Sequence, residues 1–66
     1  MAPDDSEVIR KLRHDLANPL AAILAEAQLL LLNEAELDAE TVEGLREIEA
    51  LARRMREMLQ ATKPPG

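Results

Sequence analysis

Apolar side chains recur at steps of three and four residues through the first half of the chain. The repeating positions are Ile9, Leu12, Leu16, Pro19 with Leu20, Ile23, Ala27 and Leu30. This spacing places them in one stripe along an α-helix. The stripe continues through Pro19, which good helix formers flank, so we expect the proline to bend the helix rather than end it. Asp4, with Glu7 three residues later, is a suitable N-cap. The pattern predicts a first helix over about residues 5–32.

A polar segment, Asn33 to Asp38, interrupts this pattern. Asp38 is placed to cap a second helix, with Leu37 and Val42 packing across its start as a hydrophobic staple. The second stripe contains Leu45, Ile48, Ala52, Met55, Leu59 and Thr62, widened on one flank by Leu51 and Met58. We predict a turn over about residues 33–38, a second helix over about residues 39–62, and a C-terminal linker at about 63–66.

The short turn predicts two antiparallel helices in a single domain that covers residues 1–66. A hairpin alone covers only part of each apolar stripe. Leu24, Leu29 and Leu32 lie outside the main stripe of the first helix, so this end of the helix needs more than one neighbour. The predicted fold is therefore all-α: a two-helix hairpin, kinked at Pro19, that dimerises into a four-helix bundle.

The composition excludes several functional classes. The chain of 66 residues has no cysteine and one histidine, which leaves no disulfide and none of the common zinc ligand sets. It has no aromatic side chains and a net charge of -5, so we expect no nucleic acid partner. Polar residues interrupt its most apolar segment, Leu16 to Leu32, which predicts no membrane contact by this segment and a cytoplasmic location. A membrane anchor elsewhere in a parent protein stays open. The arginines at 53, 54 and 56 are distributed around the second helix, where we expect them to keep it soluble.

The single histidine, His14, is predicted to lie on the side of the first helix opposite the apolar stripe, with Asn18 one turn later on the same exposed ridge. Pro19 leaves the carbonyl of Asp15 without its helical donor, so the predicted kink falls on the turn that carries His14. A neutral imidazole is a nucleophile near pH 7 when an acceptor holds the proton of one nitrogen, and Asp15 is the nearby candidate acceptor. An ordinary surface histidine is the alternative interpretation.

Two stretches of the chain carry a resemblance to a known family. The segment "HDLANPLAAI", which begins at His14, resembles the H-box of two-component histidine kinases, whose usual form is H-E-L-R-T-P-L-T-x-I. The run "LREIEALARRMREML" is similar to the second helix of that family. The resemblance covers about Val8 to Leu59 and implies a dimerisation and histidine-phosphotransfer domain of the HisKA type, folded as a dimeric four-helix bundle.

The resemblance also implies roles for single residues. His14 would attack the γ-phosphate of ATP and become a phosphohistidine, and Asp15 would be the adjacent acid that orients and activates it. Asn18 would position a water for dephosphorylation of the response regulator, and Pro19 matches the kink proline. Two positions depart from the family pattern: Arg13 stands where a small serine is frequent, and the alanine at 17 stands where an arginine is frequent. These departures bear on partner preference more than on the chemistry.

The implied partners are a second copy of the chain, a kinase catalytic domain and the receiver domain of a response regulator. ATP and Mg²⁺ would be held by that separate catalytic domain and no cofactor by this chain, which should not phosphorylate itself with ATP alone. We expect Ala21, Ala25 and Gln28, small or polar residues beyond His14, to border the receiver's docking site, although helix propensity also explains the alanines. Two other functions stay open: a non-catalytic helical oligomerisation module, and a stand-alone histidine phosphotransferase bundle.

Overall fold

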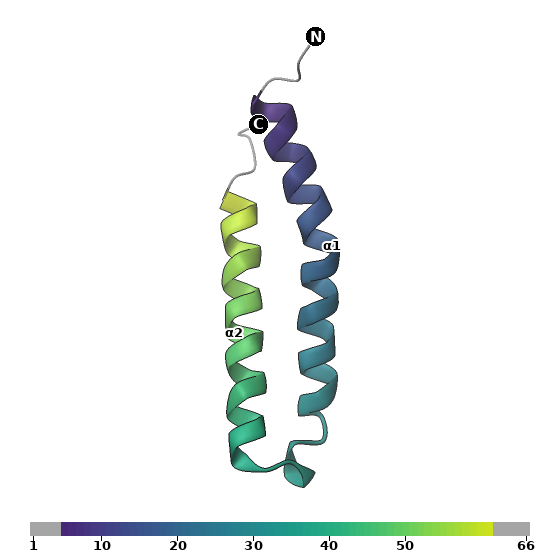
Figure 1. Ribbon diagram of the computed structural model, residues 1–66, viewed down its shortest axis with the longest axis vertical. Helices are drawn as coiled ribbons and strands as arrows, with labels where there is room; N and C mark the ends of the chain where they lie inside the picture. Colours follow the sequence, from purple (N-terminus) through teal and green to yellow (C-terminus); the bar gives the residue numbers. More distant parts are fainter. Residues whose placement is uncertain (1–4, 62–66) are drawn as a thin grey trace.

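Two long helices run antiparallel in the structure, a computed structural model that describes residues 5–61. They are α1 (Asp5–Leu31) and α2 (Ala39–Ala61), joined through a short 3-10 helix, η1 (Glu34–Glu36). Figure 1 shows the helices side by side with η1 at the closed end of the hairpin, in a molecule with extents of 54 × 18 × 18 Å. The predicted all-α helical hairpin is confirmed. The predicted cap Asp4 and the linker at 63–66 lie outside the described residues.

Pro19 lies inside α1, and the helix continues on both sides of it. The apolar pattern that runs through the proline explains this, because packing along one face outweighs the loss of a single backbone hydrogen bond. The helix ends at Leu31, one residue before the predicted end, where the Leu32 and Asn33 amides donate to carbonyls three residues earlier. The kink at Pro19 stays a prediction.

The turn between the helices is closed by its own polar groups. Asp38 caps α2: its Oδ1 accepts the backbone N–H of Thr41 at 2.7 Å, and its carbonyl accepts the amide of Val42 at 3.0 Å. Hydrogen bonds from Thr41 hold the pKa of the Asp38 carboxyl below its ordinary value. An ion pair of 2.6 Å between Arg46 Nη2 and Glu34 Oε2 joins the turn to α2.

The contact between the helices occupies one edge of the apolar stripe predicted for α1. Its buried residues are Leu20, Leu24, Ala27 and Ala52, with Leu59 packed against them. Leu24, which the spacing places outside the main stripe, belongs to this contact, since only 8% of the residue is exposed. Successive residues turn by about 100°, so a stripe built on steps of three and four is wider than one neighbouring helix can cover. The other edge of the stripe stays exposed.

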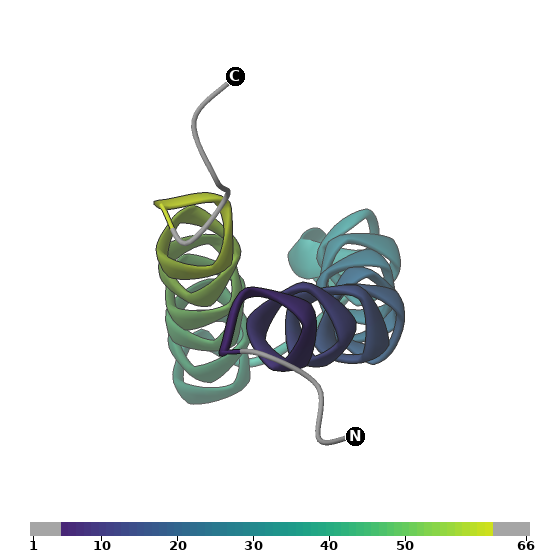
Figure 2. The ribbon, with the colours of Figure 1, turned by 90° about the horizontal axis from the view of Figure 1, so that it is seen from above.

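That exposed edge forms a large apolar surface along one flank of the hairpin, here called the apolar flank. It comprises Leu12, Leu16, Ile23 and Leu30 of α1 with Ile48, Leu51, Met55 and Met58 of α2. Each of these residues is between 39% and 61% exposed. Viewed along its length in Figure 2, the hairpin has α1 and α2 side by side, and no other described element covers this flank.

Candidate functional site

His14 is presented to solvent from the middle of the first half of α1. Its side chain is 78% exposed, which agrees with the prediction that it points away from the apolar stripe. Asn18, one turn later, is also exposed, and Pro19 follows it directly. The ring is therefore accessible to a reactant or partner that approaches from outside the hairpin.

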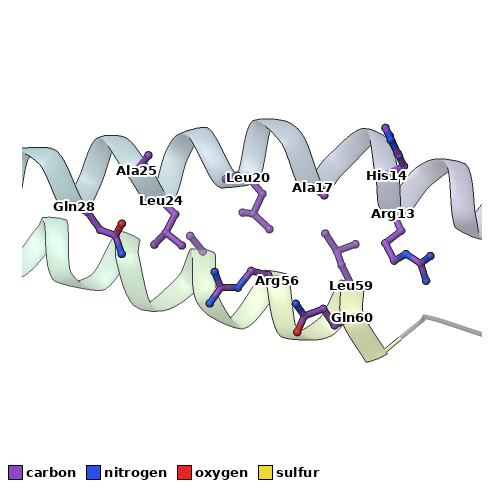
Figure 3. Close-up of a pocket in the computed structure, with 12 residues that line it drawn as sticks. Arg13, His14, Ala17, Leu20, Leu24, Ala25, Gln28, Arg56, Leu59 and Gln60 are labelled. Carbon is purple, nitrogen blue, oxygen red and sulfur yellow. The ribbon is translucent and has the colours of Figure 1, made fainter.

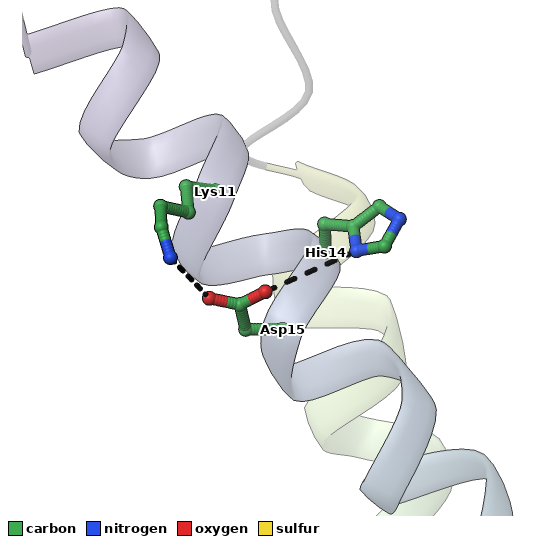
Figure 4. A network of polar contacts seen from close by, with 3 residues as sticks. All are labelled: Lys11, His14 and Asp15. Atoms are coloured by element: carbon green, nitrogen blue, oxygen red, sulfur yellow. Dashed lines mark hydrogen bonds and ion pairs between the residues drawn. The ribbon is translucent and has the colours of Figure 1, made fainter.

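A short polar network surrounds the imidazole, as Figure 4 shows. The Nδ1 atom of His14 lies 4.0 Å from Oδ1 of Asp15, while the other oxygen of Asp15 accepts a hydrogen bond of 3.2 Å from Nζ of Lys11. The contact between imidazole and carboxylate is thus electrostatic, because 4.0 Å exceeds hydrogen-bond length. The other ring nitrogen, Nε2, faces outward in Figure 4.

A groove of about 560 Å³ runs between the two helices on the side opposite the apolar flank. His14 stands at its outer edge in Figure 3. Its floor is apolar, formed by Leu20, Leu24, Ala52 and Leu59, and its walls carry Arg13, His14, Ala17, Ala21, Ala25, Gln28, Arg56 and Gln60. The structure thus brings three residues predicted to border the docking site, Ala21, Ala25 and Gln28, into the same groove as the histidine, whereas Asn18 does not line it.

Gln28 also links the two helices within this groove. The carboxylate of Glu49 on α2 accepts a hydrogen bond of 3.2 Å from Nη2 of Arg53, and the side chain of Gln28 on α1 acts on the same carboxylate. Hydrogen bonds from Arg53 and Gln28 together hold the pKa of Glu49 below its ordinary value. Gln28 therefore has a structural role besides the docking role expected of it.

Two arginines of the groove were not singled out as site residues from the sequence. Arg13 lines it from α1, and its Nη1 is buried with no hydrogen-bond partner. Arg56 lines it from α2. Arg13 stands four residues before Ala17 and seven before Leu20, a spacing that places all three on one side of a helix. This spacing was the signal in the sequence that could have placed Arg13 in the groove.

The described residues hold neither a cluster of metal ligands nor a membrane-spanning helix. Within residues 5–61, no group of three histidine, aspartate or glutamate side chains is placed to hold a metal ion. Neither helix in this range combines the length and the apolar content needed to cross a lipid bilayer.

An exposed imidazole next to a carboxylate lies on the first helix of an antiparallel hairpin. The class of protein that carries this arrangement comes from comparison of the sequence with known families. Residues 4–62 match the family of His Kinase A (phospho-acceptor) domains, and the chain belongs to this family. Its class is thus the dimerisation and phospho-acceptor domain of two-component histidine kinases. No curated protein and no solved structure matches the chain.

Proposed function

We propose that His14 accepts the γ-phosphoryl group of ATP and passes it to an aspartate of a response regulator receiver domain. The observation that carries this proposal is the geometry at His14: a side chain 78% exposed, with Nδ1 turned toward Asp15 and Nε2 turned outward. Since ATP is the donor, the proposal implies that this reaction occurs in the cytoplasm.

In the first step, the Nε2 lone pair attacks the γ-phosphorus of ATP, a phosphorus–nitrogen bond forms, and the bond from phosphorus to the bridging oxygen breaks to release ADP. The proton on Nδ1 stays close to the Asp15 carboxylate, which stabilises the positive charge on the ring. In the second step, a carboxylate oxygen of the receiver attacks the phosphorus. The phosphorus–nitrogen bond then breaks, its electron pair returns to Nε2, and an acyl phosphate is formed.

The nucleotide has to be held by another domain. Phosphoryl transfer from ATP needs groups that bind the triphosphate and Mg²⁺ against the nucleophile. We assign this task to a separate kinase catalytic domain, so that the chain incubated with ATP alone stays unphosphorylated.

We further propose that two copies of the chain pair through the apolar flank to form a four-helix bundle. Eight large apolar residues that stay 39–61% exposed form a continuous surface of the kind that marks a protein interface. The groove beside His14 lies on the other side of the hairpin and stays accessible in such a dimer.

Asn18 is proposed to position the water that removes the phosphoryl group from the receiver. Asn18 is exposed one turn beyond His14, so a receiver that docks at His14 would come close to its side-chain amide. Replacement by alanine is expected to lengthen the lifetime of the phosphorylated receiver without changing phosphorylation of His14. Equal lifetimes with Asn18 and with Asn18→Ala would contradict this role.

The test of the phospho-acceptor function is to incubate the chain with ATP, Mg²⁺ and a separately purified histidine kinase catalytic domain. We expect one acid-labile phosphoryl group per chain, measured by intact mass, and none on the variant His14→Gln. Circular dichroism of His14→Gln serves as the control for folding. Absence of phosphoryl incorporation into the unmodified chain would instead support a non-catalytic oligomerisation module.

A further inference from the structure

The charges of the chain are divided unequally between the two halves of the hairpin. Residues 5–20 and 52–61, the half that carries His14, contain six basic and four acidic side chains. Residues 21–51, the half that carries the turn, contain one basic and eight acidic side chains. Although the net charge of the chain is -5, the half of the hairpin that carries His14 is positive. An anionic surface is attracted toward the His14 half and repelled from the turn half, which orients it along the hairpin.

Two basic side chains near the groove are already paired. Lys11 is bound to Asp15 at 3.2 Å, and Arg53 to Glu49 at the same distance. Arg13 and Arg56 differ, because neither forms an ion pair with any residue in the range 5–61. Both line the groove, Arg13 from α1 and Arg56 from α2, as Figure 3 shows.

The Arg13 guanidinium is incompletely satisfied. Its Nη1 is buried and has no hydrogen-bond partner. A buried donor without an acceptor is destabilising, and a guanidinium binds a carboxylate through two parallel hydrogen bonds. A carboxylate brought into the groove by a partner would satisfy this donor.

The rest of the groove favours a protein over a small anion as its occupant. Beyond Arg13 the walls carry small side chains, Ala17, Ala21 and Ala25, above a floor that includes Leu20 and Leu24. Small side chains allow close approach of another helix, and an apolar floor favours burial of apolar protein side chains. A phosphate group alone would leave this surface uncovered.

We propose that Arg13 and Arg56 bind carboxylates of the receiver domain that docks in the groove, and that Arg13 determines which receivers are accepted. This inference rests on the proposed function. It adds that the recognised surface is acidic next to its phospho-accepting aspartate and apolar where it meets the alanines. The two arginines offset the repulsion that Asp15 exerts on an approaching carboxylate.

The test uses phosphoramidate, a small donor that phosphorylates histidine without a kinase, and a panel of purified receiver domains. The chain, Arg13→Glu, Arg13→Lys and Arg54→Glu are phosphorylated at His14 and mixed with each receiver, and the transfer rate is measured at low and high salt. Arg54→Glu is the matched control, because it makes the same change of charge at an exposed position outside the groove.

For the receiver that accepts phosphate fastest from the unmodified chain, Arg13→Glu is expected to lower the transfer rate about tenfold, and Arg54→Glu to leave it within about twofold. Arg13→Lys keeps the charge but not the paired hydrogen bonds, so its rate should fall between those of Arg13→Glu and the unmodified chain. High salt is expected to slow the unmodified chain and to have little effect on Arg13→Glu.

Equal transfer rates for Arg13→Glu and Arg54→Glu would overturn the inference and leave the proposed function standing. A second result would also overturn it: Arg13→Glu leaves the transfer rate unchanged but shortens the lifetime of phosphorylated His14 in the absence of a receiver. Arg13 would then stabilise the phosphoryl group on His14 rather than bind the receiver. Failure of the unmodified chain to transfer phosphate to any receiver would overturn the proposed function, and this inference with it.

Discussion

The two flanks of the hairpin share one buried core and differ in nearly everything else. The apolar flank presents large side chains such as Leu16, Ile23 and Met55. The groove flank presents alanines, with His14 at its edge and arginines on its walls. Burial of a large apolar side chain contributes roughly 1.5–3 kcal/mol, whereas burial of an alanine methyl contributes far less. The apolar flank is therefore suited to a permanent partner, and the groove flank to one that binds and leaves.

This difference would allow one small hairpin to bind the two proposed partners at once. A partner that covers the apolar flank leaves the groove open, because the two surfaces lie on opposite sides of the contact between α1 and α2. Gln28, which lines the groove, acts on the Glu49 carboxylate of the other helix. Four measurements test this division, from the largest expected effect to the smallest.

The largest effect is expected from charge placed on the apolar flank. The double variant Leu16→Glu with Met55→Glu should raise the dissociation constant of the proposed dimer by about 1,000-fold or more, because two carboxylates would be buried without partners. Sedimentation equilibrium measures this constant. Ala21→Glu, which adds the same charge on the groove flank, should leave it unchanged. Equal weakening by Ala21→Glu would show that the two flanks are not divided as proposed.

A smaller effect is expected in the core that both flanks share. Leu24→Ala should lower the free energy of unfolding by about 2–3 kcal/mol, because it removes a side chain that is 8% exposed and leaves a cavity. Leu29→Ala, at a residue that is 57% exposed, should lower it by less than about 0.5 kcal/mol. Urea unfolding at one fixed protein concentration compares the two. Similar losses would mean that Leu24 belongs to an outer surface.

On the groove flank, a larger side chain should slow phosphoryl transfer to the receiver without slowing phosphorylation of His14. Ala21→Phe fills the wall of the groove and is expected to slow transfer from His14 to its receiver about tenfold, equivalent to about 1.4 kcal/mol. Ala22→Phe adds the same side chain at an exposed position outside the groove and should leave transfer unchanged. Rapid-quench measurement of both steps separates them. Slower phosphorylation of His14 in Ala21→Phe would contradict this division of roles.

The smallest effect concerns pH. Because hydrogen bonds hold the pKa of Glu49 below its ordinary value in the folded chain, its contribution to stability is present above that ordinary value and is lost as the pH falls through the lowered one. Glu49→Gln should therefore melt below the unmodified chain at pH 7, and the two should converge once the pH falls below the lowered pKa of Glu49. Thermal midpoints measured by circular dichroism test this. Leu16→Ala, on the apolar flank, should lower the thermal midpoint by a similar amount across the same pH range.

Much of the fold follows from local chemistry. The stripes at steps of three and four, the cap at Asp38 and the polar segment before it predict two antiparallel helices. The structure ends α1 at Leu31, one residue short of the predicted end, and describes α2 as far as Ala61, the last described residue. The interior position of Pro19 was predicted from the stripe that runs through it. The candidate site was equally local, since His14, Asp15 and Asn18 stand within five consecutive residues.

The amino-acid sequence by itself determined the helices, the exposed histidine and its acidic neighbour, because each depends on residues within one or two turns of each other. Only the tertiary structure decided which edge of the wide apolar stripe meets α2, and so buried Leu24 and exposed Ile23. The same choice placed Arg13 and Arg56 in one groove although 43 positions separate them in the chain. The physical reason is that periodicity sets the direction of a side chain around its own helix, whereas the rotation of one helix against another is set by packing between them.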